Sequence, residues 1–70
     1  MKFSDKVYYL RMKKKLTQTE LAGLAHITQS TVQAYESGRA KPLYNTMLSL
    51  AKALDVDVND LMNDERSITE

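Results

Sequence analysis

The sequence predicts an all-α fold, a single compact domain of five short helices. Strand signals are absent, since β-branched residues are scattered and the chain has only two glycines and one proline. Apolar residues recur at helical spacing, and four segments begin with a small polar residue that has an apolar neighbour before it and another four residues after it. These signals predict helices at about 4–14, 18–25, 28–37, 44–54 and 58–63.

The first two helices carry clear start signals. Ser4 is the expected cap of the first, with Phe3 packing on Tyr8. Thr17 is the expected cap of the second, and Glu20 completes a capping box by reaching back to the Thr17 amide. The entry angle of each helix is therefore specified locally.

The third predicted helix has an unusual outer surface. Thr28 is its expected cap, and Val32 and Tyr35 are its expected inward residues. Its outward positions carry amides, hydroxyls and one methyl group, whereas solvated helix faces usually carry charges. We call these outward positions the neutral face: Gln29, Ser30, Gln33, Ala34 and Ser37.

The second and third helices are expected to form a corner. About three residues connect them, and the small side chain of Ala22 permits a close crossing. Both helices are too short to persist alone in water, so each must bury one face. The pair therefore predicts a helix-turn-helix.

The last two helices are expected to close the core. Asp57 is the expected cap of the fifth, with Val56 packing on Leu61. Leu48 and the methionines are expected to be core residues. The apolar stripe of the fourth helix is expected to be Tyr44, Met47, Leu48, Ala51 and Leu54.

Composition argues against several classes of protein. There is no cysteine and one histidine, so neither a disulfide nor a metal site is expected. No apolar run approaches a membrane span of about 20 residues, and the N-terminal residues lack a signal-peptide pattern, so a cytoplasmic protein is expected. An enzyme is not expected, because no paired acids suggest an active site, and neither a cofactor nor a small-molecule ligand is evident.

Charge is distributed unevenly along the chain. Residues 1–41 hold eight basic and three acidic residues, whereas residues 42–70 hold two basic and six acidic ones. Such a bipolar chain indicates one face for a polyanion and another kept away from it. The basic run RMKKK at 11–15 has an alternative interpretation as a favourable helix C-terminus.

The segment TQTELAGLAHITQSTVQAYESGRAKP resembles the helix-turn-helix of the lambda-repressor-like (Xre) family of DNA-binding regulators. The preceding VYYLRMKKKLTQTELA is similar to the first helix of that family leading into the second, and PLYNTMLSLAKALDVDVNDLM to its closing pair. The resemblance implies a compact five-helix lambda-repressor-like DNA-binding domain over residues 1–64, followed by a polar tail at 65–70.

In this family the second corner helix lies in the DNA major groove. The resemblance implies that Gln29, Ser30, Gln33 and Ala34 read base edges, where amides, hydroxyls and methyl groups have partners. It also implies a set of phosphate contacts, in which Gln18 additionally braces the reading helix. These expected phosphate contacts are Gln18, Thr28, Arg39, Lys41 and Asn45.

Other positions have structural expectations. The resemblance implies an ion pair between Arg11 and Glu36, and Gly38 is expected to supply the left-handed turn after the reading helix. His26 occupies a turn position where the family most often has glycine, and it is interpreted as turn filler rather than a pH sensor. Lys15 and Leu43 also depart from the family pattern, which weakens the capping of their helices.

The predicted function is a sequence-specific transcriptional regulator, a repressor that binds double-stranded DNA as a homodimer. The expected region of self-contact is the acidic C-terminal part, with Val56, Val58, Leu61, Met62 and Ile68. The alternative is an antitoxin-like or anti-repressor-like protein-binding helical module. As a third interpretation, Gln29, Ser30 and Gln33 are ordinary surface residues.

Overall fold

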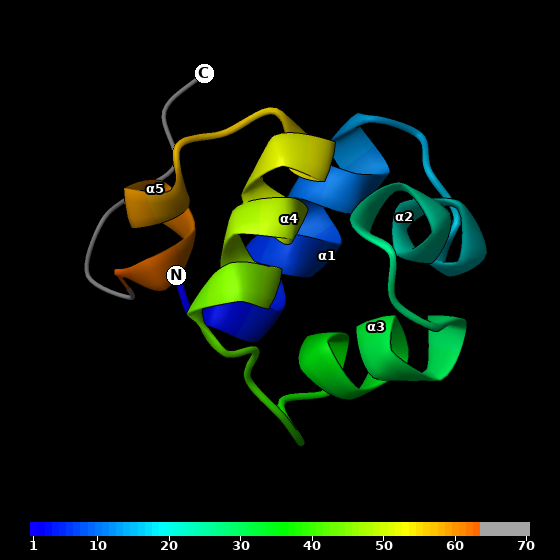
Figure 1. The fold of residues 1–70 in the computed structure, drawn as a ribbon, viewed down its shortest axis with the longest axis horizontal. Helices are drawn as coiled ribbons and strands as arrows, with labels where there is room; N and C mark the ends of the chain where they lie inside the picture. The colour runs from blue at the N-terminus through cyan, green and yellow to red at the C-terminus, as the bar shows by residue number, and fades with distance from the viewer. Residues whose placement is uncertain (64–70) are drawn as a thin grey trace.

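The computed structural model describes residues 1–63 and confirms the predicted all-α fold. Its helices start and end within two residues of the predicted bounds, and none of them is long and apolar enough to cross a membrane. The predicted tail at 65–70, Ile68 included, lies outside the described residues. The helices are α1 (Phe3–Lys13), α2 (Gln18–Ala25), α3 (Gln29–Glu36), α4 (Tyr44–Leu54) and α5 (Val58–Met62) (Figure 1).

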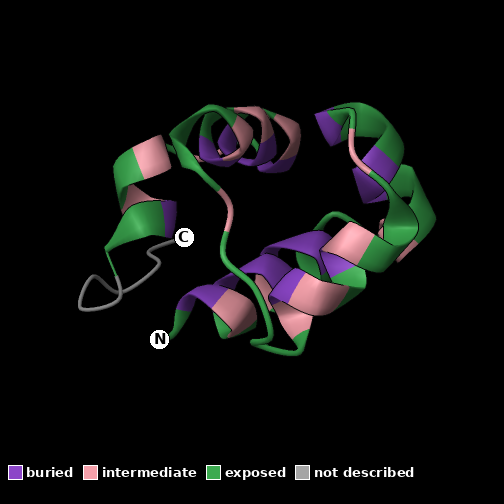
Figure 2. Cartoon of the chain, turned by 60° about the horizontal axis from the view of Figure 1, so that its bottom comes forward, coloured by how far each residue is buried: buried purple, intermediate pink, exposed green. Residues whose placement is uncertain are grey.

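The five helices pack around one apolar core. In space α1 packs on α3 and α5, α2 packs on α3 and α4, and α4 packs on α5, so the contacts form a closed ring. The corner helices α2 and α3 lie on one side of the molecule and α5 lies on the other (Figure 1). Figure 2 shows the buried faces of the helices turned toward this shared interior. The core consists of Phe3, Val7, Leu10, Leu21, Ala22, Ala25, Val32, Tyr35, Met47, Leu50, Ala51, Leu54 and Leu61.

The start of α1 differs from the prediction. The helix begins at Phe3, with Lys2 at the cap position and no side-chain cap, so the prediction that Ser4 caps it is wrong. Phe3 does not pack on Tyr8 but contacts Tyr35 edge-on, with ring centroids 5.9 Å apart. Because Phe3 is helical, it shares the inner face with Val7 one turn later, and Tyr8 is left exposed.

The other capped starts are confirmed. Oγ1 of Thr17 accepts from the Glu20 amide, and the Glu20 carboxylate accepts from the Thr17 amide at 2.8 Å, which completes the capping box. The side chain of Thr28 caps α3 and that of Asp57 caps α5. At α4 the cap position is Leu43, which has no capping hydrogen bond, as its departure from the family pattern implied.

Three helices are followed within two residues by a left-handed residue that is not glycine. Lys15, His26 and Asp55 have φ of 58°, 60° and 62°. At the α2–α3 corner, the amide of Ile27 then donates to the Ala22 carbonyl at 2.9 Å and closes the helix end. The interpretation of His26 as a turn residue therefore agrees with its backbone geometry.

The buried stripe of α4 is displaced from the predicted one. Met47, Leu50, Ala51 and Leu54 are buried, whereas Tyr44 and Leu48 are exposed, so their assignment to the core is wrong. Both stripes have helical spacing, and the position of α2 and α5 decides between them. Of the methionines, only Met47 is buried; the exposed ones are Met1, Met12 and Met62.

A buried lysine ties α1 to α5, which the sequence analysis missed. Lys6 is fully buried, and its Nζ donates to the Asp60 carbonyl at 2.5 Å and to the Asn63 carbonyl. An ammonium group favours the end of a helix where the carbonyls have no helical partner. Lys6 thereby holds the short α5 against the first helix.

Candidate nucleic-acid interface

The neutral face of α3 is turned to solvent. Gln29, Ser30, Gln33 and Ser37 are exposed and Ala34 is partly buried. Val32 and Tyr35 on the opposite side of the helix are buried, as predicted. Ala22 of α2 is also buried, at the predicted crossing of the two corner helices. The corner therefore displays a strip of uncharged polar groups on a rigid support.

A shielded ion pair fixes α3 to α1. Nε of Arg11 donates to Oε2 of Glu36 at 2.6 Å, and its Nη2 donates to Oε1 at 3.0 Å. The two side chains are only 10% and 8% exposed. Arg11 also donates to the Leu16 carbonyl at 2.7 Å, and the hydrogen bond from Arg11 to Glu36 raises the pKa of the guanidinium above its usual value. The structure thus contains the ion pair that the resemblance implied.

The Glu36 carboxylate also orients two carboxamides. Nε2 of Gln18 donates to Oε1 of Glu36 at 3.1 Å, and Nε2 of Gln29 donates to Oε1 of Gln18 at 2.7 Å. A carboxylate only accepts hydrogen bonds, so each amide in this chain turns an N–H toward its inner neighbour. Within residues 1–63, Oε1 of Gln29 then has no protein donor and is available as an acceptor.

This amide chain has a simple local origin. Gln18 and Gln29 are each the first helical residue after a threonine cap, at the starts of α2 and α3. The corner brings the two starts together, so Gln18 braces Gln29 as the resemblance implied. The repeated Thr-Gln pair in the sequence was a signal for the direct amide–amide contact, which the sequence analysis did not use.

Hydroxyl groups cluster at the start of α3. Oγ1 of Thr28 lies 3.1 Å from Oγ of Ser30 and 2.8 Å from Oγ1 of Thr31. Thr28 also accepts from the Thr31 amide at 3.2 Å. A predicted phosphate contact and a predicted base reader therefore share one hydrogen bond.

The chain reverses after α3 and brings a cation to the neutral face. Gly38 has a φ of +80°, in the left-handed region predicted for it. Arg39 follows, and its Nε donates to Oγ of Ser37 at 3.1 Å while its Nη2 donates to Oε1 of Gln33. The predicted phosphate contact Arg39 is thus joined to the predicted base reader Gln33.

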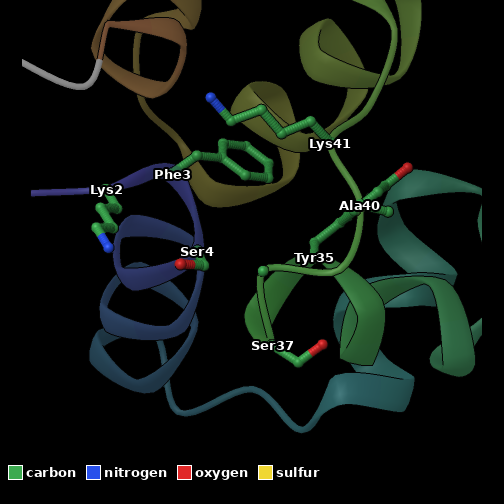
Figure 3. Close-up of a pocket in the computed structure, with 8 residues that line it drawn as sticks. Lys2, Phe3, Ser4, Tyr35, Ser37, Ala40 and Lys41 are labelled. Atoms are coloured by element: carbon green, nitrogen blue, oxygen red, sulfur yellow. The ribbon is translucent and has the colours of Figure 1, made fainter.

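The remaining two predicted phosphate contacts lie farther along the chain. Lys41 lines a surface hollow of about 440 Å³ whose walls include Phe3 and Tyr35. Figure 3 shows Lys41 and Ser37 on opposite sides of this hollow. Asn45 is an exposed residue in the first turn of α4.

The predicted region of self-contact is corrected at one position. Leu61 is fully buried within the chain, so it is not available for a second copy. Val56 and Val58 are partly buried against the core, and Met62 is exposed. Leu61 was included as an apolar residue of the acidic C-terminal region, but α5 packs it into the core.

Comparison with known proteins places the chain in a family. The helix-turn-helix family matches residues 7–61. An uncharacterized HTH-type transcriptional regulator of Bacillus subtilis, YqaE, is 36% identical over 63 residues, which is 90% of this chain and 54% of that protein. The cryptic phage CTXphi transcriptional repressor RstR of Vibrio cholerae is 34% identical over 65 residues, or 93% of this chain and 59% of RstR.

Solved structures show the same fold. The P22 c2 repressor in complex with a synthetic operator aligns with a TM-score of 0.88 at 20% identity, covering 93% of this chain and 98% of that one. The restriction-modification controller protein C.AhdI of Aeromonas hydrophila aligns with a TM-score of 0.81 at 33% identity, covering 86% and 91%.

The curated relatives are longer proteins, of which this chain spans between 34% and 59%. The match to the family itself extends over most of the chain, from the first helix to the fifth. The chain therefore belongs to the helix-turn-helix family and has the fold of its lambda-repressor-like (Xre) members.

Proposed function

We propose that the chain is a sequence-specific DNA-binding transcriptional regulator that inserts α3 into the major groove. The observation that carries this proposal is the neutral face, whose Gln29 amide is anchored through Gln18 to a shielded ion pair. Amides, hydroxyls and a methyl group match the donors, acceptors and thymine methyl groups of base edges. In this proposal Gln29, Ser30, Gln33 and Ala34 read bases.

Phosphate contacts supply most of the affinity in this proposal. The backbone amides at the start of a helix and its dipole favour a phosphate, and Gln18 is the first residue of α2. Thr28 is the N-terminal cap of α3, one residue before the helix begins. Two cations and one amide after α3 complete the set: Arg39, Lys41 and Asn45.

The regulator acts as a homodimer and as a repressor, not as an enzyme, and it resides in the cytoplasm. One helix-turn-helix reads one half-site, and two half-sites about one helical turn apart give the affinity that regulators require. Two relatives support repression by their names, RstR and the immunity repressor of Bacillus phage phi105, the second 30% identical over 70 residues.

The proposal is tested by selecting bound fragments from random DNA and measuring affinity for the recovered site. The wild-type chain is expected to recover a near-palindromic sequence, with affinity falling steeply as salt rises. Gln29→Ala should lose ~1–3 kcal/mol on that site and much less on random DNA. As a control, Lys41→Ala should weaken every sequence alike and flatten the salt dependence by about one counterion.

Two results would contradict the proposal. Recovery of no preferred sequence at low salt would exclude base reading. Equal loss by Gln29→Ala on selected and random DNA would show that Gln29 contacts DNA without reading its bases.

A further inference from the structure

The C-terminal half of the neutral face has its own anchor. The guanidinium of Arg39 makes two hydrogen bonds to the neutral face, from Nε to Oγ of Ser37 and from Nη2 to Oε1 of Gln33. Oγ of Ser37 in turn donates to the Ala34 carbonyl at 3.1 Å. The side chain of Arg39 is thus held at two points beside a residue of the neutral face.

The backbone explains why Arg39 reaches this position. The left-handed Gly38 turns the chain back, and the amides of Arg39 and Ala40 both donate to the Ala34 carbonyl, at 3.0 and 3.3 Å. The residue after the turn is therefore fixed next to the last turn of α3. The long side chain of an arginine at this position reaches back to Gln33 in the last turns of α3.

The contact decides which end of the Gln33 amide is available. A guanidinium carries only donors, so it must take the Oε1 end of the carboxamide. Within the described residues, Nε2 of Gln33 has no protein acceptor. Its two N–H groups are then the part that remains for a ligand, which makes Gln33 a donor.

We propose that Arg39 is a positioning residue that makes Gln33 a hydrogen-bond donor specific for guanine. This inference rests on the proposed function of α3 as a major-groove reader. Guanine presents two acceptors on its major-groove edge, O6 and N7, which suit the two N–H groups of one NH2. Adenine places a donor beside N7, cytosine presents a donor alone, and thymine presents the single acceptor O4 beside its methyl group.

The two glutamines of the neutral face then differ in what they read. Gln29 keeps its Oε1 and one N–H, the pair that suits adenine. Oε1 of Gln33 is occupied by Arg39, so this glutamine offers only N–H groups and suits guanine instead. The polarity of each amide is set by the charge of its anchor, an anion for Gln29 and a cation for Gln33.

The test measures base preference, which a purely structural or phosphate role of Arg39 would leave unchanged. Affinities of the full chain are measured for the selected site and for all four bases at each position of one half-site. The variants are Gln33→Ala, Arg39→Ala, the double variant of both, and Lys41→Ala as the matched loss of a nearby cation.

Gln33→Ala is expected to lose a preference of about tenfold at one base pair, which carries guanine in the selected site. Arg39→Ala should lose the preference at the same base pair and also weaken binding to every sequence. The double variant should show the same base preference at this pair as Gln33→Ala alone, because Arg39 acts on the pair through Gln33. Lys41→Ala should keep the guanine preference.

Intact guanine preference in Arg39→Ala would overturn the inference and leave Arg39 as a phosphate contact only. Preference for an A·T or T·A pair at the position that depends on Gln33 would also overturn it. Both results require that the wild-type chain prefers a sequence. Absence of any such preference would instead refute the proposed function, so the two failures are distinguishable.

Discussion

The two halves of α3 hold chemically identical side chains by different means. Gln29, at the start of the helix, is anchored through Gln18 to the Glu36 carboxylate, which is only 8% exposed. Gln33, one turn later, is anchored to Arg39, which is exposed. An exposed cation has water and salt as competitors, whereas a shielded carboxylate does not.

One half of the neutral face is therefore held more rigidly than the other. The N-terminal half of the helix is tied into the core of the protein, so its amide is preorganised before a ligand arrives. The C-terminal half is set by an exposed contact for which water and salt compete. Substitutions at Glu36, Ala22, Gln18 and Tyr35 act on one or both of these halves, with effects that decrease in that order.

Glu36→Ala breaks the shielded anchor and is expected to have the largest effect. It leaves the Arg11 guanidinium buried without its charge partner and removes the acceptor of Gln18, so the free energy of unfolding should fall by ~3–5 kcal/mol. Urea denaturation measures it. A double variant, Arg11→Leu with Glu36→Leu, should lose less because no unpaired charge remains. A loss below about 1 kcal/mol in Glu36→Ala would mean that the pair is effectively solvated.

Ala22→Leu disturbs the support that both halves share. Ala22 is buried where α2 meets α3, and a larger side chain should overpack the crossing and destabilise the fold by ~1–3 kcal/mol. Gly23→Ala is a control in the same helix. A Cβ added there meets nothing within 4 Å, so this variant should be stabilised by about 0.5–1 kcal/mol. Equal thermal stability of Ala22→Leu and wild type would refute the close crossing.

Gln18→Ala removes the hydrogen bond that orients the Gln29 amide and keeps the contact of Arg39 with Gln33. Loss of one amide–amide hydrogen bond should weaken binding to the selected site by about 1 kcal/mol. The change in base preference should be confined to the positions that Gln29→Ala also affects, and NMR of the side-chain NH2 groups should show altered exchange for Gln29 only. An altered preference at the base pair of Gln33 would show that the two halves are not independent.

Tyr35→Phe is expected to have the smallest effect, and it concerns the buried side of the C-terminal half. Burial raises the pKa of Tyr35, so the folded chain favours the neutral phenol. This stabilisation is fully present below the pKa of the unfolded chain, about 10, and is lost as pH rises from there through the raised pKa of the folded chain. Unfolding measured from pH 8 to 11 should therefore show a steeper loss of stability for wild type than for Tyr35→Phe. Parallel curves would contradict the burial of the phenol.

The fold could be predicted from the sequence where short-range signals specify it. The caps Thr17, Thr28 and Asp57 and the turn at Gly38 depend on neighbours within four residues, and the structure contains each of them. The prediction for Ser4 was wrong because α1 begins one residue earlier, at Phe3. Phe3 contacts Tyr35, which is distant in the sequence and could not be inferred from local signals.

Which helix residues are buried depended on tertiary packing wherever the local sequence pattern allowed more than one answer. Two stripes of α4 have helical spacing, and only the position of the neighbouring helices buries Leu50 rather than Leu48. Lys6 lies in a helical stripe with Phe3 and Val7, yet its burial depends on carbonyls at the end of α5. The choice of candidate site residues followed the family register, but the contact of Arg39 with Gln33 required the path of the chain after Gly38.

The central claim is that the neutral face of α3 touches base edges in the major groove. Methylation interference on the selected site tests it most directly, because dimethyl sulfate modifies guanine N7 in the major groove and adenine N3 in the minor groove. Methylation of guanine N7 within each half-site should block binding of the wild-type chain. Interference confined to adenine N3, or none at either atom, would contradict it.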